Sequence, residues 1–192
     1  NGAGVIDVNP NDDTPTADDA GAVHSYYSPF SNNVRDFFQT GTLFQNSLTI
    51  NSGDRNGYFS ATLGSLEREF VVQDDKLSRY SALFKAGASV GKWKLDGQFN
   101  FIRRKTSETS STIYHDLLQA SSDIPITAFE AYPDRAYAWN IYYGNPYYSI
   151  KHNRYNNLSN YFNAIASVQY DVNSHISLMY RGNVQYTNTE SN

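Results

Sequence analysis

The side chains that could bind a metal ion in this sequence are four histidines and an acidic segment near the N-terminus. The histidines, at positions 24, 115, 152 and 175, lack a second histidine at metal-ligand spacing. Residues 7–13 place oxygen atoms at alternate positions, as calcium-binding loops do, but Asp12 stands where such a loop needs glycine and Asp18 where it needs glutamate. We therefore expect a solvated acidic loop there, and no metal or other cofactor.

Motifs for catalysis are absent from the sequence. It contains no cysteine, which excludes a thiol nucleophile and disulfides, and it has no G-x-S-x-G, H-E-x-x-H or phosphate-binding glycine motif. Carboxylates are numerous, but spacing along the chain cannot pair two of them for glycoside hydrolysis. The net charge is −4 with scattered basic residues, which argues against a nucleic-acid partner. We expect a protein that is not an enzyme.

A cluster of aromatic residues with polar neighbours is the best candidate for ligand binding. Flat aromatic faces beside Asp134, Arg135 and Asn140 suit contact with a sugar, a peptide or a covering partner protein, and long loops of this kind are often functional. The alternative is that the rings only pack the loop against its neighbours. The contact candidates are Tyr137, Trp139, Tyr142, Tyr143, Tyr147 and Tyr148.

Period-two alternation of apolar and polar residues predicts the elements that position this cluster. In the clearest example, apolar residues alternate along 80–90 and 93–101, separated by Gly91 and Lys92, which predicts a long hairpin. Similar patterns flank turns at 52–56 and 171–175. The sequence therefore predicts an all-β fold with about six antiparallel strands in three hairpins.

Strand length and loop asymmetry favour a membrane barrel over a soluble sandwich. The predicted strands approach the ~9–11 residues of a tilted membrane strand, and short turns alternate with long connections, as in outer-membrane barrels. The polar face would then line the lumen, with Lys94, Asp96, Gln98, Asn100, Arg181 and Asn183. The predicted parts are an extracellular loop or coil at 1–42 that leads into the barrel, hairpins at 43–66, 78–103 and 158–188, and extracellular loops at 67–77 and 104–157.

The composition agrees with a barrel in a membrane. Aromatic residues make up 15% of the chain, with 16 Tyr and 11 Phe, and tyrosine suits a boundary between water and lipid. A secreted all-β carbohydrate-binding module is also rich in Tyr and Asn, so it remains an alternative, as does an outer-membrane barrel with an assembly or adhesion role.

Residues 26–66 carry a resemblance to a known family. The phrase Asn-Asn-Val-Arg-Asp-Phe-Phe-Gln-Thr-Gly at 32–41, followed by a strand at 45–50 and by Gly53 and Tyr58, resembles SusC-like (RagA-like) TonB-dependent outer-membrane transporters. Weaker similarity continues through 77–81, 123–126, 145–148 and 163–171. Residues 1–25 are outside the resemblance.

The resemblance implies a fold and a function beyond what the residues themselves show. It implies a large plugged barrel of roughly 22 strands, of which this chain is a fragment. It also implies import of oligosaccharides or peptides across a Bacteroidota-type Gram-negative outer membrane, with energy from TonB and a SusD-like surface lipoprotein as a lid. The family's plug domain and TonB box have no counterpart in the sequence.

Overall fold

The computed structural model describes residues 5–7, 24–26, 29–120, 122, 125–137 and 144–192, and divides them between two compact units. One unit takes in 39–110 and 152–192 and contains a six-stranded sheet; the other takes in 1–38 and 111–151 and is mainly helical. No helix among the described residues combines the length and the apolar character that crossing a bilayer requires.

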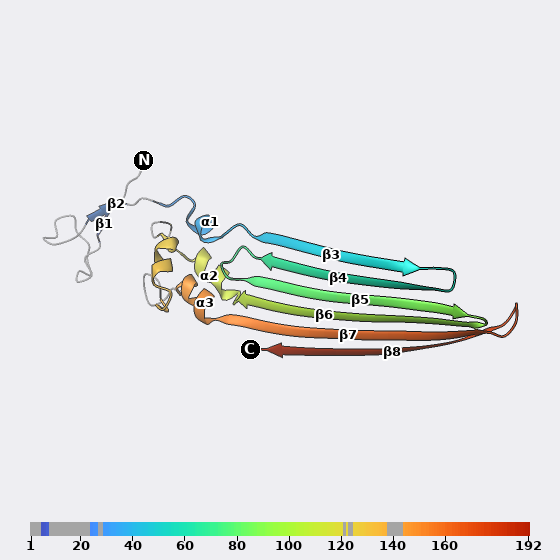
Figure 1. The fold of residues 1–192 in the computed structure, drawn as a ribbon. Coiled ribbons are helices and arrows are strands. Elements are labelled where there is room, and N and C mark those ends of the chain that lie inside the picture. Colours follow the sequence, from blue (N-terminus) through green and yellow to red (C-terminus); the bar gives the residue numbers. More distant parts are fainter. Residues whose placement is uncertain (1–4, 8–23, 27–28, 121, 123–124, 138–143) are drawn as a thin grey trace. The chain divides into compact units, whose positions relative to one another are not determined.

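The sheet is an antiparallel meander in which each strand pairs with the next along the chain (Figure 1). All six predicted strands are present, and the all-β expectation is confirmed for this unit. The strands are β3 (Thr42–Gly53), β4 (Gly57–Glu69), β5 (Lys76–Val90), β6 (Trp93–Thr109), β7 (Arg154–Asp171) and β8 (Ser177–Ser191).

Short turns join the strands at one end of the sheet, and side chains or glycine shape each of them. The Asp54 carboxylate accepts hydrogen bonds from the backbone N–H groups of Asn56 and Gly57, at 2.8 and 2.9 Å. Asn173 caps the β7–β8 turn in the same way. Between β5 and β6, Gly91 takes φ +59°, which a side chain would disfavour.

Pairing extends beyond the predicted hairpins at the other end of the sheet. The three hairpins cover 42–69, 76–109 and 154–191, so the connections shrink to 70–75 and 110–153. Apart from Leu77 and Tyr155, the added residues are polar on both faces of the strands. Their backbone groups still form hydrogen bonds between strands. Without alternating apolar and polar residues, however, the sequence does not distinguish such a strand from a polar loop.

A nearly buried ion pair fixes the extended strand ends. Arg154, the first residue of β7, contacts the Asp75 carboxylate at 3.1 Å, with side-chain exposures of only 16% and 11%. The same carboxylate oxygen accepts from the backbone N–H and the hydroxyl of Thr109, both at 2.8 Å. The β4–β5 connection is thereby joined to the points where the long connection leaves β6 and enters β7.

The described residues of the long connection contain short helices. The helical unit contains α1 (Asn33–Phe37), α2 (Thr112–Leu118), the 3₁₀ helix η1 (Ile126–Ala131) and most of α3 (Pro146–His152), together with a small sheet of β1 (Val5–Asp7) and β2 (His24–Tyr26). Both α2 and η1 lie within the segment predicted as the loop 104–157. The description of 1–42 as coil is wrong at α1 and at the β1–β2 pair.

Side chains inside this unit hold its connections in place. The Asn33 side chain accepts a hydrogen bond from the Ile126 N–H at 2.9 Å, which ties α1 to η1. Asn145 is almost fully buried: its amide donates to the Tyr132 carbonyl at 2.9 Å and its oxygen accepts from the Tyr147 N–H at 3.0 Å. Asn145 thus begins α3 with its polar atoms satisfied.

We predict that Asp75→Ala loosens the long-connection end of the sheet. The variant removes the carboxylate that faces the nearly buried guanidinium of Arg154, which costs about 3 kcal/mol. Hydrogen exchange measured by mass spectrometry should rise in peptides covering the end of β6 and the start of β7. Lys76→Ala is the control, because its contact with Glu69 is 3.9 Å and exposed. Equal exchange in both variants would contradict the prediction.

Candidate functional site

The six residues predicted to face a lumen all lie on one face of the sheet, here called the polar face. Residues paired across antiparallel strands share a face, and the register aligns Asp96 with Ser167 and Ser167 with Arg181. Gln98 and Asn183 occupy the next aligned row, and Asn100 the row after it. Lys94 precedes Asp96 by two residues on β6.

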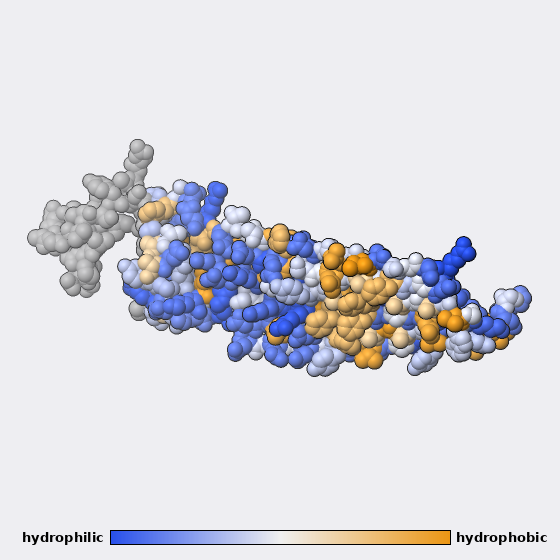
Figure 2. Space-filling model, in the orientation of Figure 1, coloured by the Kyte–Doolittle hydropathy of each residue, from blue (hydrophilic) through white to orange (hydrophobic). Residues whose placement is uncertain are grey.

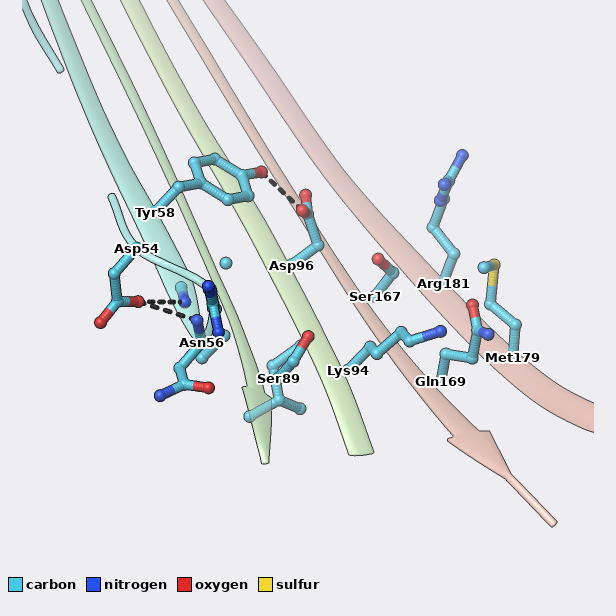
Figure 3. Close-up of a pocket in the computed structure, with 15 residues that line it drawn as sticks. Asp54, Asn56, Tyr58, Ser89, Lys94, Asp96, Ser167, Gln169, Met179 and Arg181 are labelled. Atoms are coloured by element: carbon cyan, nitrogen blue, oxygen red, sulfur yellow. Dashed lines mark hydrogen bonds between the residues drawn. The ribbon is translucent and has the colours of Figure 1, made fainter. Parts of the chain in front are cut away.

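A hollow of about 490 Å³ lies on the polar face next to the short turns (Figure 3). It is lined by residues from β4 to β8 and from the β3–β4 turn, and most of its side chains are polar or charged. Its principal polar lining residues are Asp54, Tyr58, Lys94, Asp96, Gln169 and Arg181.

A tyrosine laid across a glycine organises one side of the hollow. The Tyr58 hydroxyl on β4 donates to the Asp96 carboxylate on β6 at 2.5 Å, crossing the intervening strand β5 at Gly87 (Figure 3). A Cβ atom on Gly87 would lie 2.4 Å from the Tyr58 ring. Gly87 therefore makes this contact possible. A glycine inside a strand is the sequence signal for close approach, but it does not identify the partner.

The other side of the hollow contains both a neutralised and an unpaired cation. Lys94 contacts the Asp171 carboxylate at 3.0 Å, and Gln169 donates to the other oxygen of the same group at 2.9 Å. Arg181 has no ion pair within the described part of the chain. The hollow thus presents a guanidinium, amides and hydroxyls, which are suited to hydrogen bonding with water or a polar solute.

On the part of the polar face farther from the short turns, side-chain amides form hydrogen bonds between neighbouring strands. Asn163 on β7 is 8% exposed, and its amide donates to the Asn183 side-chain oxygen on β8 at 3.0 Å. Asn163 also pairs in register with Asn100 on β6. These groups form a polar surface away from the turns as well.

The opposite face, here called the apolar face, carries a continuous apolar band. In one aligned row the strands contribute Ile50, Ala61, Phe84, Phe99, Ala164 and Val184. Apolar side chains gather over the half of the sheet near the short turns (Figure 2). Towards the long connections the rows become polar. The large side chains of the band are half exposed, with Leu48 at 59% and Leu63 at 49%.

Aromatic rings mark both borders of the apolar band. Trp93 and Tyr170, paired in register next to the short turns, place their ring centroids 4.6 Å apart. At the other border Tyr186 pairs with Phe162. Tyr80 is 53% exposed in the next row, whose other members are all polar. Rings with a polar tip are suited to a boundary between apolar and aqueous surroundings.

The aromatic contact candidates in the long connection have different environments. Tyr137 is 54% exposed and forms an isolated bridge with Gly144. Tyr147 is buried with its ring against Phe37 at 5.2 Å, so its role is packing and it is unsuited to ligand contact. Tyr148 is half-buried. Trp139, Tyr142 and Tyr143 lie outside the described residues.

Burial also alters two ionisable groups in the helical unit. Desolvation, with a smaller contribution from Glu130, raises the pKa of Tyr147 to about 12, so this hydroxyl stays neutral at physiological pH. Burial raises the pKa of Asp116, and the nearby His115 partly opposes that shift. The described residues contain no group of three or more His, Asp or Glu that could hold a metal ion. The possible calcium-binding segment lies almost wholly outside them.

Comparison of the sequence with known protein families and with curated proteins finds no match. The two faces of the sheet, together with the sequence, are therefore the basis for assigning a function.

We predict that Gly87→Ala destabilises the protein through the Tyr58 ring. The added methyl group must displace the ring or bend β5, at a cost of about 1–3 kcal/mol. Thermal unfolding followed by circular dichroism should show a lower Tm. Gly182→Ala is the matched control, because a Cβ there meets nothing within 4 Å.

A double variant isolates the cause. Replacing Tyr58 with Ala removes the ring, so Gly87→Ala should then lower the Tm little further. If Gly87→Ala has the same effect with and without the tyrosine ring, the contact does not explain the need for glycine.

Proposed function

We propose that this chain forms part of the wall of an outer-membrane β-barrel transporter, with the apolar face toward lipid and the polar face toward the lumen. The observation that carries the proposal is the apolar band that crosses all six strands. Three aligned rows cross all six strands and two more cross five and four of them, which together cover roughly 600 Å² from standard strand spacings. Soluble monomers rarely expose an apolar surface of that size.

The height of the band supports a membrane environment. Tilted by about 40° from the membrane normal, roughly 27 Å of strand spans about 21 Å, close to the apolar band of outer-membrane barrels. Trp93 and Tyr170 would lie at one interface and Tyr80 and Tyr186 at the other, as aromatic girdles do. The short turns would face the periplasm, and the polar strand ends with the long connections would project outside.

The arrangement of the strands argues against the carbohydrate-binding module. A sandwich buries its apolar face against a second sheet, and within the described residues the only other sheet is the three-residue pair β1–β2. The edges of β3 and β8 also lack partner strands in this part of the chain. Open edges are not tolerated in lipid, so the proposal includes further strands that close the barrel.

The resemblance to SusC-like transporters makes the proposal more specific. It supports import of oligosaccharides or peptides, energised by TonB and covered by a SusD-like lipoprotein. Tyr137 and Tyr148, together with Trp139, Tyr142 and Tyr143, remain the contact candidates for substrate or lid. The polar face, with Arg181 and the Tyr58–Asp96 pair, would border the route through the barrel.

Tryptophan fluorescence tests the membrane orientation, because the chain has only two tryptophans, Trp93 and Trp139. The proposed barrel has further strands outside this chain, so tryptophans in those strands are first replaced by phenylalanine, and in the variant Trp139→Phe only Trp93 then emits. Lipids brominated close to the headgroup should quench it more strongly than lipids brominated at the chain ends, because Trp93 borders the apolar band. Trp93→Phe is the control, since the remaining tryptophan is in the long connection and should be quenched less. Absence of quenching in Trp139→Phe would refute the lipid-facing assignment.

Growth tests the transport function. A strain lacking the gene should fail to grow on one class of oligosaccharide or peptide while still growing on the corresponding monomers. Complementation with the double variant Trp139→Ala and Tyr142→Ala should restore the protein to the membrane but restore growth poorly, because interface anchors often contribute ~2 kcal/mol or more each. Phe44→Ala, at an exposed edge-strand position, is the control. Unchanged growth of the deletion strain on every oligomer would contradict the proposal.

A further inference from the structure

A second hollow, on the apolar face, lies at the border of the band nearest the long connections. Its volume is about 500 Å³, and its lining is mostly apolar, with Leu48, Leu63, Tyr80, Ala82 and Phe101 as main contributors. Small residues deepen it, because Ala82 pairs in register between the larger Leu63 and Phe101. We call it the rim groove.

Two exposed cations lie just beyond the rim groove on the same face. Arg103 pairs in register with Tyr80, and it follows the groove residue Phe101 by two positions on β6, which is about 7 Å along a strand. Lys105 follows two positions later. Neither cation has an ion pair or hydrogen bond within the described part of the chain. We call Arg103 and Lys105 the rim cations.

The acidic groups on this part of the face already have other partners. Glu67 accepts hydrogen bonds from the hydroxyls of Ser78 and Tyr80, at 2.5 and 2.7 Å. Glu69 lies 3.9 Å from Lys76, and Glu190 accepts from the amide of Asn188 at 3.3 Å. Glu67 and Glu190 are each two strands from Lys105, about 9.5 Å away.

We propose that the rim groove and the rim cations together bind an anionic membrane lipid, with an acyl chain in the groove and its phosphate on Arg103 and Lys105. This inference rests on the proposed function, since the groove is continuous with the band assigned to lipid. A molecule that fills the groove and reaches the cations must be apolar at one end and anionic at the other. Because the net charge of the chain is −4, the chain as a whole does not attract an anion, and the attraction for the phosphate comes from these two cations.

Neutral groups beside the cations complete the headgroup site. Asn160 pairs in register with Arg103, while Asn46 and Ser65 belong to the lining of the groove. Their amides and hydroxyl can donate to phosphate oxygens. The site therefore offers two charges and several donors at the level where a headgroup meets the acyl region.

Native mass spectrometry of the full-length protein tests the site. Micelles are doped with equal amounts of phosphatidylglycerol and phosphatidylcholine that carry the same acyl chains, and the retained lipid is counted. Wild type should retain phosphatidylglycerol preferentially. A cation at the membrane surface contributes about fivefold to such attraction, so Arg103→Gln with Lys105→Gln should reduce the preference by up to about 25-fold.

The matched control removes two cations from the opposite face of the same sheet, Lys85→Gln with Arg104→Gln. It should keep the preference, as should the charge-preserving pair Arg103→Lys with Lys105→Arg. Loss of the preference to the same extent in the control would show a net-charge effect and overturn the proposal. An unchanged preference in Arg103→Gln with Lys105→Gln would overturn it too.

A further arm separates lipid from free phosphate. Excess inorganic phosphate should leave phosphatidylglycerol bound, because the acyl chain contributes to affinity. If inorganic phosphate displaces the lipid fully, the ligand is a free anion and the lipid assignment is wrong. Quenching of Trp93 by brominated lipids separates failure of this lipid site from failure of the proposed function. If Trp93 is quenched but the protein shows no preference for phosphatidylglycerol, only the lipid site is rejected. If Trp93 is not quenched, the assignment of the chain to a barrel wall is rejected as well.

Discussion

The backbone ladder from β3 to β8 is the constraint on which the rest of this structure depends. Because side chains alternate across a strand, one register decides the face of every residue in all six strands. A slip of one residue in β6 would move Phe99 to the polar face and Gln98 to the apolar face. The register therefore sets the composition of both faces together, and a change in one face changes the other.

The two ends of the sheet are stabilised by different kinds of contact. At the short-turn end, Asp54, Gly91 and Asn173 supply local turn chemistry within a few residues. At the other end the strands continue beyond the apolar band, and the contact between Asp75 and Arg154 joins residues that are 79 positions apart. The short-turn end is thus shaped by contacts within a few residues, whereas the other end depends on a contact between distant parts of the chain.

The polar face combines rigid contacts with an unpaired charge. The Tyr58–Asp96 hydrogen bond and the Lys94–Asp171 ion pair link strands across the sheet. Arg181 remains available to a solute or to another part of the protein. In the proposed transporter, these contacts would preserve the shape of the wall, and the unpaired charge would interact with the solute.

The sequence by itself determined the strands, the faces and the turns. Alternation along 80–90 and 93–101 depends only on the chain's own period of two, so it needed no knowledge of partners. The six residues assigned to the polar face, from Lys94 to Asn183, follow from the same property. The turn at Gly91 and Lys92 was also predictable, because its backbone chemistry is local.

Only the tertiary structure decided the strand ends and the long-range contacts. Strands that are polar on both faces carry no alternation, so the extension of β6 to Thr109 and the start of β7 at Arg154 had no signal in the sequence. Tyr147, predicted as a contact residue, is instead buried against Phe37. The bond from Tyr58 to Asp96 spans 38 positions and depends on Gly87 lying between them. These features arise from side chains that meet only after the strands have paired, and spacing along a single chain does not encode which residues will meet.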